Sequence, residues 1–310
     1  MNHWTTDILG KPFEARTIDH RDGSRCTVVR LSKRGAKRGI LYIHGFSDYF
    51  FQAHMAREFH KAGLAFYAVD LRRYGRSLRQ GEAMFEIAEM TDYFADIESA
   101  AAVMRLDGIS KITLMGHSTG GLTASLYMAV GHPVPEIDTL VLNSPFLDWN
   151  MPLLLRRVGV PAVSALGRFF PKMRLRQPDD MEYARSLSKS MRGEWDYNQD
   201  WKPYRMPDPD AAWVRAIQTA QSRLTKRAAD IKVPVLLLRS DKSAKKGDPT
   251  EKFGRADAIL DVDLISRRGR RLGAQVTEIV VHDGLHDLSL SRPDVRRFFF
   301  NAVIDWLADK

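Results

Sequence analysis

Short apolar runs alternate with amphipathic segments along most of the chain. The apolar runs have the length of buried strands, and the segments between them place apolar residues at helical spacing. This alternation predicts parallel βαβ units, with a mostly parallel sheet covered by helices on both faces. Before it, residues 13–31 contain two candidate strands around a turn at Asp22-Gly23. The expected later strands are 40–43, 64–71, 111–115, 139–143, 233–238 and 276–281, and the expected helices are 52–62, 82–106, 121–130 and 293–309.

The pattern changes in residues 146–228. This segment holds seven of the 14 prolines and four of the six tryptophans, and it has no strand-like alternation. Apolar runs at 153–155 and 163–166 predict helices with exposed apolar surface. We therefore expect a core made of residues 1–145 and 229–310, with residues 146–228 inserted as a helical cap at the carboxyl edge of the sheet.

The composition of the 310-residue chain, with 44% hydrophobic residues, is sufficient for a large core. Its single cysteine, Cys26, excludes an internal disulfide and leaves no CxxC motif for a redox or zinc site. The first residues are polar and no run approaches the roughly 18 apolar residues of a membrane span. These features predict a cytoplasmic protein.

The formal net charge is +9, and the basic residues form several clusters. A solvated basic surface is the favoured explanation, and peripheral contact with an anionic membrane is the second. No nucleic acid is expected, because the basic clusters lack the interleaved aromatic residues of a base-stacking surface. The clusters are Arg156-Arg157, 172–176, Lys245-Lys246 and 267–271.

The candidate chemistry centres on Gly116-His117-Ser118-Thr119-Gly120, which fits the pattern G-x-S-x-G. An apolar strand precedes this motif and a helix rich in small residues follows it, which is the context of a nucleophile elbow. The tight turn would force Ser118 into a strained backbone conformation and expose its hydroxyl at the start of the helix. The motif predicts that Ser118 is a nucleophile.

A serine nucleophile needs an imidazole base, and in this type of fold the base follows the last strand. Two histidines, His282 and His286, lie there. His282 ends the strand and is expected to be structural, whereas His286 lies in the loop after a glycine turn. We therefore predict His286 as the base.

Hydrolysis of an acyl bond also requires two backbone N–H groups directed at the developing oxyanion. One is expected from Thr119, which follows the nucleophile. The other is expected from Phe46, in the loop after the strand 40–43. His44, in the same loop, is predicted to support it by hydrogen bonding.

Taken together, these motifs resemble the α/β-hydrolase superfamily, and within it the branch of monoacylglycerol lipases, lysophospholipases and serine aminopeptidase-like hydrolases. The resemblance spans about residues 25–308. It implies a serine hydrolase that cleaves carboxylic esters of lipid or monoacyl type, with a cap that covers an acyl chain and with no metal or organic cofactor. The segments that carry the resemblance are 43–46, 70–77, 116–121 and 284–288.

The resemblance also helps to choose the triad acid. Asp241 directly follows a strand, in the expected topological place. Asp257 lies in Ala-Asp-Ala-Ile-Leu-Asp-Val, which resembles the acid segment of the family, with residues 242–253 as an inserted excursion. We predict Asp257 as the triad acid, with Asp241 as the alternative.

The chain departs from the family pattern in two places. One is the inserted segment 242–253 before Asp257, and the other is Arg73-Tyr74, which stands where a Gly-His pair is usual.

The same residues allow other functions. Acyl transfer or amide cleavage would use the same triad with a different acceptor or substrate. A non-catalytic binding protein on this scaffold is a further alternative, although such proteins usually lose a triad member. The sequence leaves the acyl length, the head group and the oligomeric state open.

Overall fold

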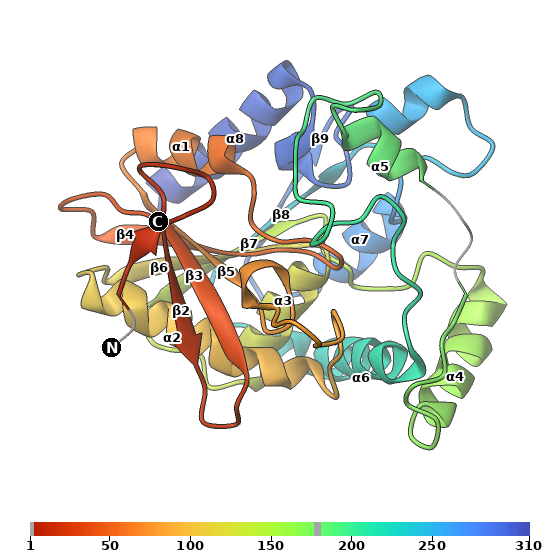
Figure 1. The fold of residues 1–310 in the computed structure, drawn as a ribbon. Coiled ribbons are helices and arrows are strands. Elements are labelled where there is room, and N and C mark those ends of the chain that lie inside the picture. Colours follow the sequence, from red (N-terminus) through yellow and green to blue (C-terminus); the bar gives the residue numbers. More distant parts are fainter. Residues whose placement is uncertain (1–2, 177–180) are drawn as a thin grey trace.

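A computed structural model describes residues 3–176 and 181–310. In this part of the chain, nine strands form one sheet in the order β1-β2-β3-β5-β4-β6-β7-β8-β9 (Figure 1). The pairs up to β3–β5 are antiparallel, and all later pairs are parallel. The mostly parallel α/β sheet predicted from the sequence is therefore confirmed. The strands are β1 Thr5–Thr6, β2 Glu14–Asp19, β3 Arg25–Leu31, β4 Arg38–Ile43, β5 Ala65–Asp70, β6 Lys111–His117, β7 Ile137–Asn143, β8 Val235–Ser240 and β9 Val276–Val281.

Helices cover both faces of the sheet. Successive side chains of β4 point to opposite faces, as the strand period of two requires. Ile40 and Tyr42 join the apolar core under α1 (Ala53–Lys61) and α8 (Pro293–Ala308), which lie side by side in Figure 1. Leu41 and Ile43 join the core under α2 (Phe94–Leu106), α3 (Thr119–Val130) and α7 (Val262–Gly269). All four β4 side chains are fully buried.

The helix expected over residues 82–106 begins later than the sequence pattern indicated. Residues 82–89 are not helical, a 3₁₀ turn covers Met90–Tyr93, and α2 starts at Phe94. The reason is Phe85, which has a φ of 64° and donates its N–H to the carbonyl oxygen of Arg73. Its ring packs against Phe46 at a centroid distance of 4.8 Å. Phe85 is therefore buried against a loop and not along a helix face.

The segment between β7 and β8 contains three α-helices and a π-helical turn in its described residues. These are η3 (Leu155–Gly159), α4 (Val160–Leu166), α5 (Glu182–Leu187) and α6 (Ala211–Arg227). Helix α6 packs against α3, and its side chains Ile217 and Leu224 belong to the main core. Helices α4 and α5 lie at the periphery of the molecule in Figure 1. The insertion thus contributes one core helix and two outer ones.

Candidate active site

Ser118 lies at the turn between β6 and α3. Its φ of 53° and ψ of −117° are strained for a residue with a side chain, as the motif predicted. The close approach of strand and helix depends on glycine. A Cβ on Gly116 would lie 2.4 Å from the carbonyl oxygen of Gly120, and one on Gly120 would lie 2.3 Å from that of His44. The turn therefore holds the serine hydroxyl at the carboxyl edge of the sheet.

Ser118, His286 and Asp257 form one hydrogen-bonded series. The Nε2 atom of His286 lies 3.0 Å from Ser118 Oγ, and its Nδ1 atom lies 2.9 Å from Asp257 Oδ2. Ser118 is 7% exposed and Asp257 is fully buried. Because a carboxylate oxygen can only accept, Nδ1 carries the proton and Nε2 is free to accept one from the hydroxyl. The structure thus brings together the three residues that the sequence singled out.

Asp257 is held by its own loop. Its Oδ1 atom accepts hydrogen bonds from the N–H groups of Ile259 at 2.9 Å and Leu260 at 2.7 Å, which leaves Oδ2 for the histidine. The alternative acid, Asp241, lies elsewhere: it accepts from the N–H of Asp283 and lies 3.5 Å from Nδ1 of His282. Each aspartate therefore faces a different histidine, and only Asp257 faces the histidine beside Ser118.

The loop after β4 runs beside the nucleophile. A Cβ on Gly45 would lie 3.2 Å from Ser118 Cβ, so the chain between His44 and Phe46 passes directly over the turn. The ring of His44 fixes this loop. Its Nε2 atom accepts from the N–H of Leu71 at 3.2 Å, so its Nδ1 atom donates to the carbonyl oxygen of Gly45 at 2.8 Å. This is the supporting role expected for His44.

Tyr74 supports the same loop by packing against His44. Its ring lies 4.7 Å from that of His44 and 4.8 Å from that of Phe85. Burial raises the pKa of its hydroxyl above the usual range, so the side chain stays neutral. Arg73, with a φ of 63°, turns outward and pairs with Glu86. The Arg73-Tyr74 pair therefore stabilises the loop by aromatic packing and a surface ion pair.

A buried polar layer lies under the candidate triad, and the sequence analysis did not anticipate it. Asp287 accepts hydrogen bonds from the side chains of Asn143, Gln52 and Ser289. Although burial raises the pKa of its carboxyl group, the neighbouring His117 and these hydrogen bonds outweigh that effect and lower the pKa below its usual value. Asp287 thus stays charged and anchors the loop that carries His286.

His117, directly before the nucleophile, belongs to this layer. Its Nδ1 atom donates to the carbonyl oxygen of Asn143 at 3.1 Å, and its ring lies 4.8 Å from that of His286. Burial lowers the pKa of His117 to about 4. The imidazole is therefore neutral near neutral pH and adds no positive charge beside His286.

The insertion contacts the site at three points. Tyr183 packs edge-on against the ring of His286 at 5.7 Å, and Trp213 packs against Phe46 at 4.4 Å. Lys202 forms an ion pair with the buried Asp48 at 2.9 Å. Because Asp48 lies in the loop after β4, this pair joins the insertion to the loop expected to provide an oxyanion donor.

Two groups of residues in the described part of the chain have potential metal-binding atoms near one another. Carboxylates in both already have cationic partners. In the first, Asp48, His117 and Asp287, the ammonium group of Lys202 faces Asp48. In the second, His20, Cys26 and Asp96, the guanidinium group of Arg72 binds Asp96 at 2.9 Å. These partners balance negative charge that would otherwise attract a cation.

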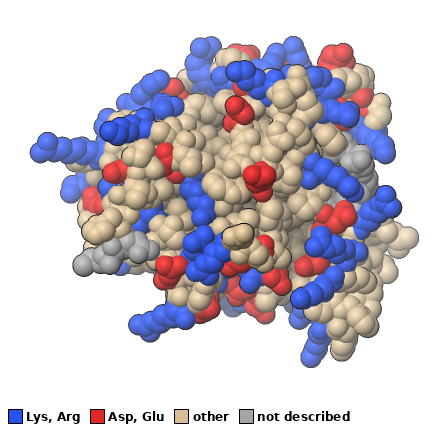
Figure 2. Space-filling model, in the orientation of Figure 1, with Lys and Arg blue, Asp and Glu red and all other residues tan. Residues whose placement is uncertain are grey.

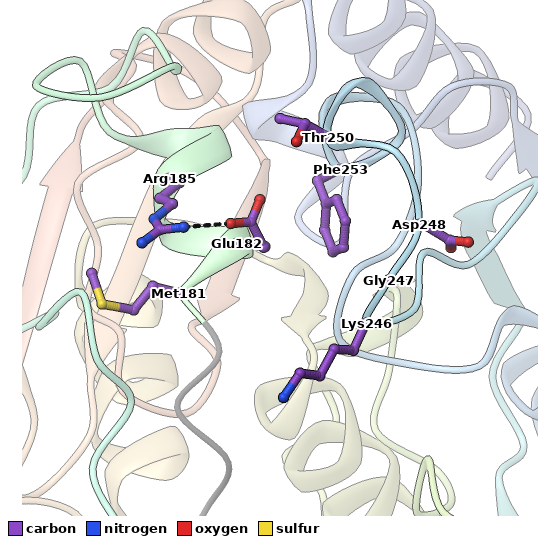
Figure 3. Close-up of a pocket in the computed structure, with 8 residues that line it drawn as sticks. All are labelled: Met181, Glu182, Arg185, Lys246, Gly247, Asp248, Thr250 and Phe253. Atoms are coloured by element: carbon purple, nitrogen blue, oxygen red, sulfur yellow. Dashed lines mark hydrogen bonds and ion pairs between the residues drawn. The ribbon is translucent and has the colours of Figure 1, made fainter.

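A separate cleft of about 370 Å³ opens between the start of α5 and the loop 246–253 (Figure 3). Glu182 and Arg185 pair on one wall, and Phe253 and Lys246 line the other. Ser118, Asp257 and His286 are absent from its lining, so this cleft does not contain the candidate triad. The cleft therefore lies where the insertion 146–228 meets the inserted loop 242–253, which precedes Asp257.

Comparison with known proteins assigns the chain to a family. Residues 35–247 match the family described as serine aminopeptidase, S33. The chain belongs to this family. The α/β-hydrolase resemblance identified in the sequence is thereby confirmed, and the protein is a hydrolase of the serine type.

Lipases and esterases are among the proteins to which this hydrolase is similar in sequence or in fold. A monoacylglycerol lipase of Mycolicibacterium smegmatis is 24% identical over 278 residues, which cover 87% of this chain and 88% of the relative. A soluble variant of monoglyceride lipase from Saccharomyces cerevisiae, solved with a substrate analogue, has a TM-score of 0.70 at 17% identity, with 100% of this chain and 98% of that chain covered. A carboxyl esterase from Bacillus coagulans, solved with glycerol, has a TM-score of 0.66 at 17% identity and coverage of 96% and 98%.

The helices in the described part of the chain were compared with the requirements of a membrane span. Among residues 3–176 and 181–310, no helix has both the length and the apolar composition that a membrane span requires.

Proposed function

We propose that this hydrolase cleaves carboxylic esters of monoacyl lipids, with Ser118 as nucleophile, His286 as general base and acid, and Asp257 as the orienting carboxylate. The observation that carries the proposal is the pair of hydrogen bonds through His286, at 3.0 Å to Ser118 and 2.9 Å to Asp257. Such a series activates an otherwise weak hydroxyl nucleophile. Membership of the serine aminopeptidase S33 family supports the same chemistry.

In the first half-reaction, Ser118 Oγ attacks the acyl carbonyl carbon while its proton passes to His286 Nε2. The carbonyl oxygen becomes an oxyanion, which the N–H groups of Thr119 and Phe46 stabilise. Thr119 is the first residue of α3, so its N–H lacks a helical acceptor and lies at the positive end of the helix. Return of the proton from His286 to the alcohol oxygen releases the alcohol and leaves an acyl-enzyme.

In the second half-reaction, His286 removes a proton from water, and the resulting hydroxide attacks the acyl carbonyl carbon. The same two N–H groups receive the oxyanion. When this tetrahedral intermediate breaks down, His286 returns the proton to Ser118 Oγ and the carboxylic acid is released. Asp257 holds the Nδ1–H tautomer throughout and stabilises the imidazolium ion that forms twice in each cycle.

Aromatic packing beside the turn supports an acyl substrate with an apolar chain. Phe146 donates its backbone N–H to the carbonyl oxygen of Ser118 at 2.9 Å, and its ring lies 5.1 Å from that of Trp149. Trp149 in turn packs edge-on against Trp213, which reaches Phe46. Three of these four aromatic residues come from the insertion 146–228, which we propose acts as a cap that excludes water from the acyl chain.

Two measurements test the proposed function. A fluorophosphonate probe should label the wild-type protein and fail to label Ser118→Ala, which would identify Ser118 as the activated nucleophile. Turnover should then be measured on glycerol monoesters of graded acyl length and on aminoacyl anilides. Ester cleavage that exceeds anilide cleavage supports the proposal. Preferential anilide cleavage would instead favour the aminopeptidase activity named in the family description.

A further inference from the structure

One segment carries most of the exposed apolar surface in the described part of the chain. The described residues include eleven exposed large apolar side chains, and eight of these lie within residues 151–170, on η3, α4 and the flanking loops. Leu154 and Phe169 are 73% and 72% exposed. Clustered exposure of this kind marks an interaction surface. The eight, here called the apolar segment, are Met151, Leu153, Leu154, Leu155, Val158, Leu166, Phe169 and Phe170.

The charge of this region has a single sign. From residue 149 to residue 178 the sequence contains no Asp or Glu, while it contains six Lys or Arg residues. In Figure 2, the region at lower right, where Figure 1 places α4, shows uncharged residues with Lys and Arg side chains beside them. The six are Arg156, Arg157, Arg168, Lys172, Arg174 and Arg176.

A cationic cleft of about 480 Å³ lies next to the apolar segment, between η3, α6 and α7. It joins basic clusters that are far apart in the sequence. Arg156 and Arg157 come from η3, Lys226 from α6, and Arg267 and Arg268 from α7. Convergence of five cations around one cleft creates a strong positive field for an anion.

The cations of the cleft divide into two groups. The only acidic residue in the lining, Asp148, binds Arg268 at 2.8 Å and lies 3.6 Å from Arg156. In the described part of the chain, Arg157, Lys226 and Arg267 have no ion-pair partner. Asp148 thus positions two guanidinium groups, and three further cations are available to a ligand.

We propose that the cationic cleft binds the phosphate of an anionic phospholipid headgroup while the apolar segment enters the adjoining membrane interface. Guanidinium groups match phosphate oxygens in charge and hydrogen-bond geometry. Apolar side chains beside Lys and Arg are the composition of an element that lies in the plane of a bilayer surface. The cleft and the segment share η3, so one approach to a membrane engages both.

The composition of the apolar segment favours a lipid over a nucleic acid as the anionic ligand. Six of the eight members of the apolar segment are aliphatic, and aliphatic side chains do not stack on nucleic acid bases. A lipid bilayer offers a phosphate layer and a hydrocarbon layer at adjacent depths, which corresponds to a cationic cleft beside an apolar surface.

The insertion that carries the apolar segment starts from the same edge of the sheet as the candidate nucleophile. The insertion leaves the sheet after β7, and Ser118 follows β6, which is parallel to it. Both therefore start from the carboxyl edge of the sheet.

The test measures vesicle binding by the Ser118→Ala protein, so that lipid turnover does not enter the result. Co-sedimentation compares vesicles of phosphatidylcholine with vesicles of phosphatidylcholine and phosphatidylglycerol. Arg157→Gln/Arg267→Gln should weaken binding to the anionic vesicles roughly 20- to 30-fold, because each cation contributes substantially at an anionic surface. Leu154→Ser/Phe169→Ser should also weaken it. The matched control, Arg34→Gln/Lys37→Gln, removes the same charge from exposed positions before β4 and should change binding little.

Several results would overturn the proposal. If the cleft variant and the control variant lose the same amount of vesicle binding, net charge and not the cleft drives binding. Titration with inorganic phosphate separates a headgroup from a free anion: if phosphate binds through Arg157 and Arg267 while the vesicles do not, the ligand is a soluble phosphate. Concentration-dependent dimerisation that Leu154→Ser/Phe169→Ser abolishes, without vesicle binding, would assign the surface to a second copy of the chain. Because every readout is binding, these results are independent of whether Ser118 is the nucleophile.

Discussion

The ring of His117 lies against the ring of His286, with 4.8 Å between their centroids, directly behind the candidate nucleophile. In the proposed reaction His286 becomes positively charged twice per cycle, so a second positive charge at this distance would oppose both steps. Burial prevents this, because it lowers the pKa of His117 to about 4. The same arrangement makes the folded protein sensitive to acid.

We predict that the free energy of unfolding falls as the pH drops from about 6.5 towards 4. Burial lowers the pKa values of both His117 and His54 to about 4, whereas unfolding returns them to about 6.5. In this window the unfolded chain binds more protons than the folded one, so acid favours unfolding. Each histidine should contribute a slope of about 1.4 kcal/mol per pH unit.

Urea unfolding across this pH range measures the slope. His54→Gln should reduce it by the contribution of one group, whereas His132→Gln, at an exposed position, should leave it unchanged. An unchanged slope in His54→Gln would contradict the contribution assigned to His54.

The two candidate acids give a second prediction. Asp257→Asn should reduce kcat by roughly 10⁴, because an amide at this position favours the wrong tautomer of His286. Asp241→Asn should have a small effect, since its carboxylate faces His282 and the N–H of Asp283. Ester turnover and thermal unfolding of both variants, measured side by side, separate catalysis from stability. A large loss of kcat in Asp241→Asn alone would show that Asp241, and not Asp257, orients His286.

Local sequence predicted the parts of this molecule that depend on local rules. The G-x-S-x-G turn, the hairpin at Asp22-Gly23 and the apolar strands are each defined within a few residues, and the structure contains them all. The proximity of His286 to Ser118 and Asp257 was also anticipated, because the carboxyl ends of parallel strands meet at one edge. Their catalytic roles are tested by the experiments proposed above.

Other features could not be derived in this way, because they depend on how distant segments meet. The Lys202–Asp48 ion pair and the contact of Tyr183 with His286 follow from the path of the insertion, which has no regular period. The cationic cleft likewise joins η3 to α7, although the sequence presents their arginines as separate clusters. The helix predicted over residues 82–106 was too long at its start, because Phe85 is buried against Phe46 of another loop and not along a helix face.

A third prediction concerns the glycine at the start of α3. Gly120→Ala should reduce the free energy of unfolding by about 3 kcal/mol or more, because the new Cβ would lie 2.3 Å from the carbonyl oxygen of His44. The atoms nearest to this Cβ are backbone atoms of Ile43 and His44, so a rotation of a side chain cannot relieve the clash. Gly254→Ala is the matched control, since its Cβ would have no neighbour within 4 Å. Equal stabilities of the two variants in urea unfolding would show that the turn is looser than the structure indicates.

The last prediction concerns Trp213, which joins the insertion to the loop that carries the proposed oxyanion donor. Its ring lies 4.4 Å from that of Phe46 and 6.1 Å from that of Trp149, so it connects the loop after β4 with the aromatic residues of the insertion, where we propose that the acyl chain binds. Trp213→Ala should lower kcat/KM for long-chain glycerol monoesters at least tenfold, because a contact with the chain near the reacting centre is lost. For two-carbon esters, which are too short to reach such a contact, the loss should be smaller. Phe298→Ala, at an exposed position on α8, should leave the chain-length profile unchanged. Equal losses for short and long esters would indicate that Trp213 acts through the position of Phe46 alone and that the acyl chain lies elsewhere.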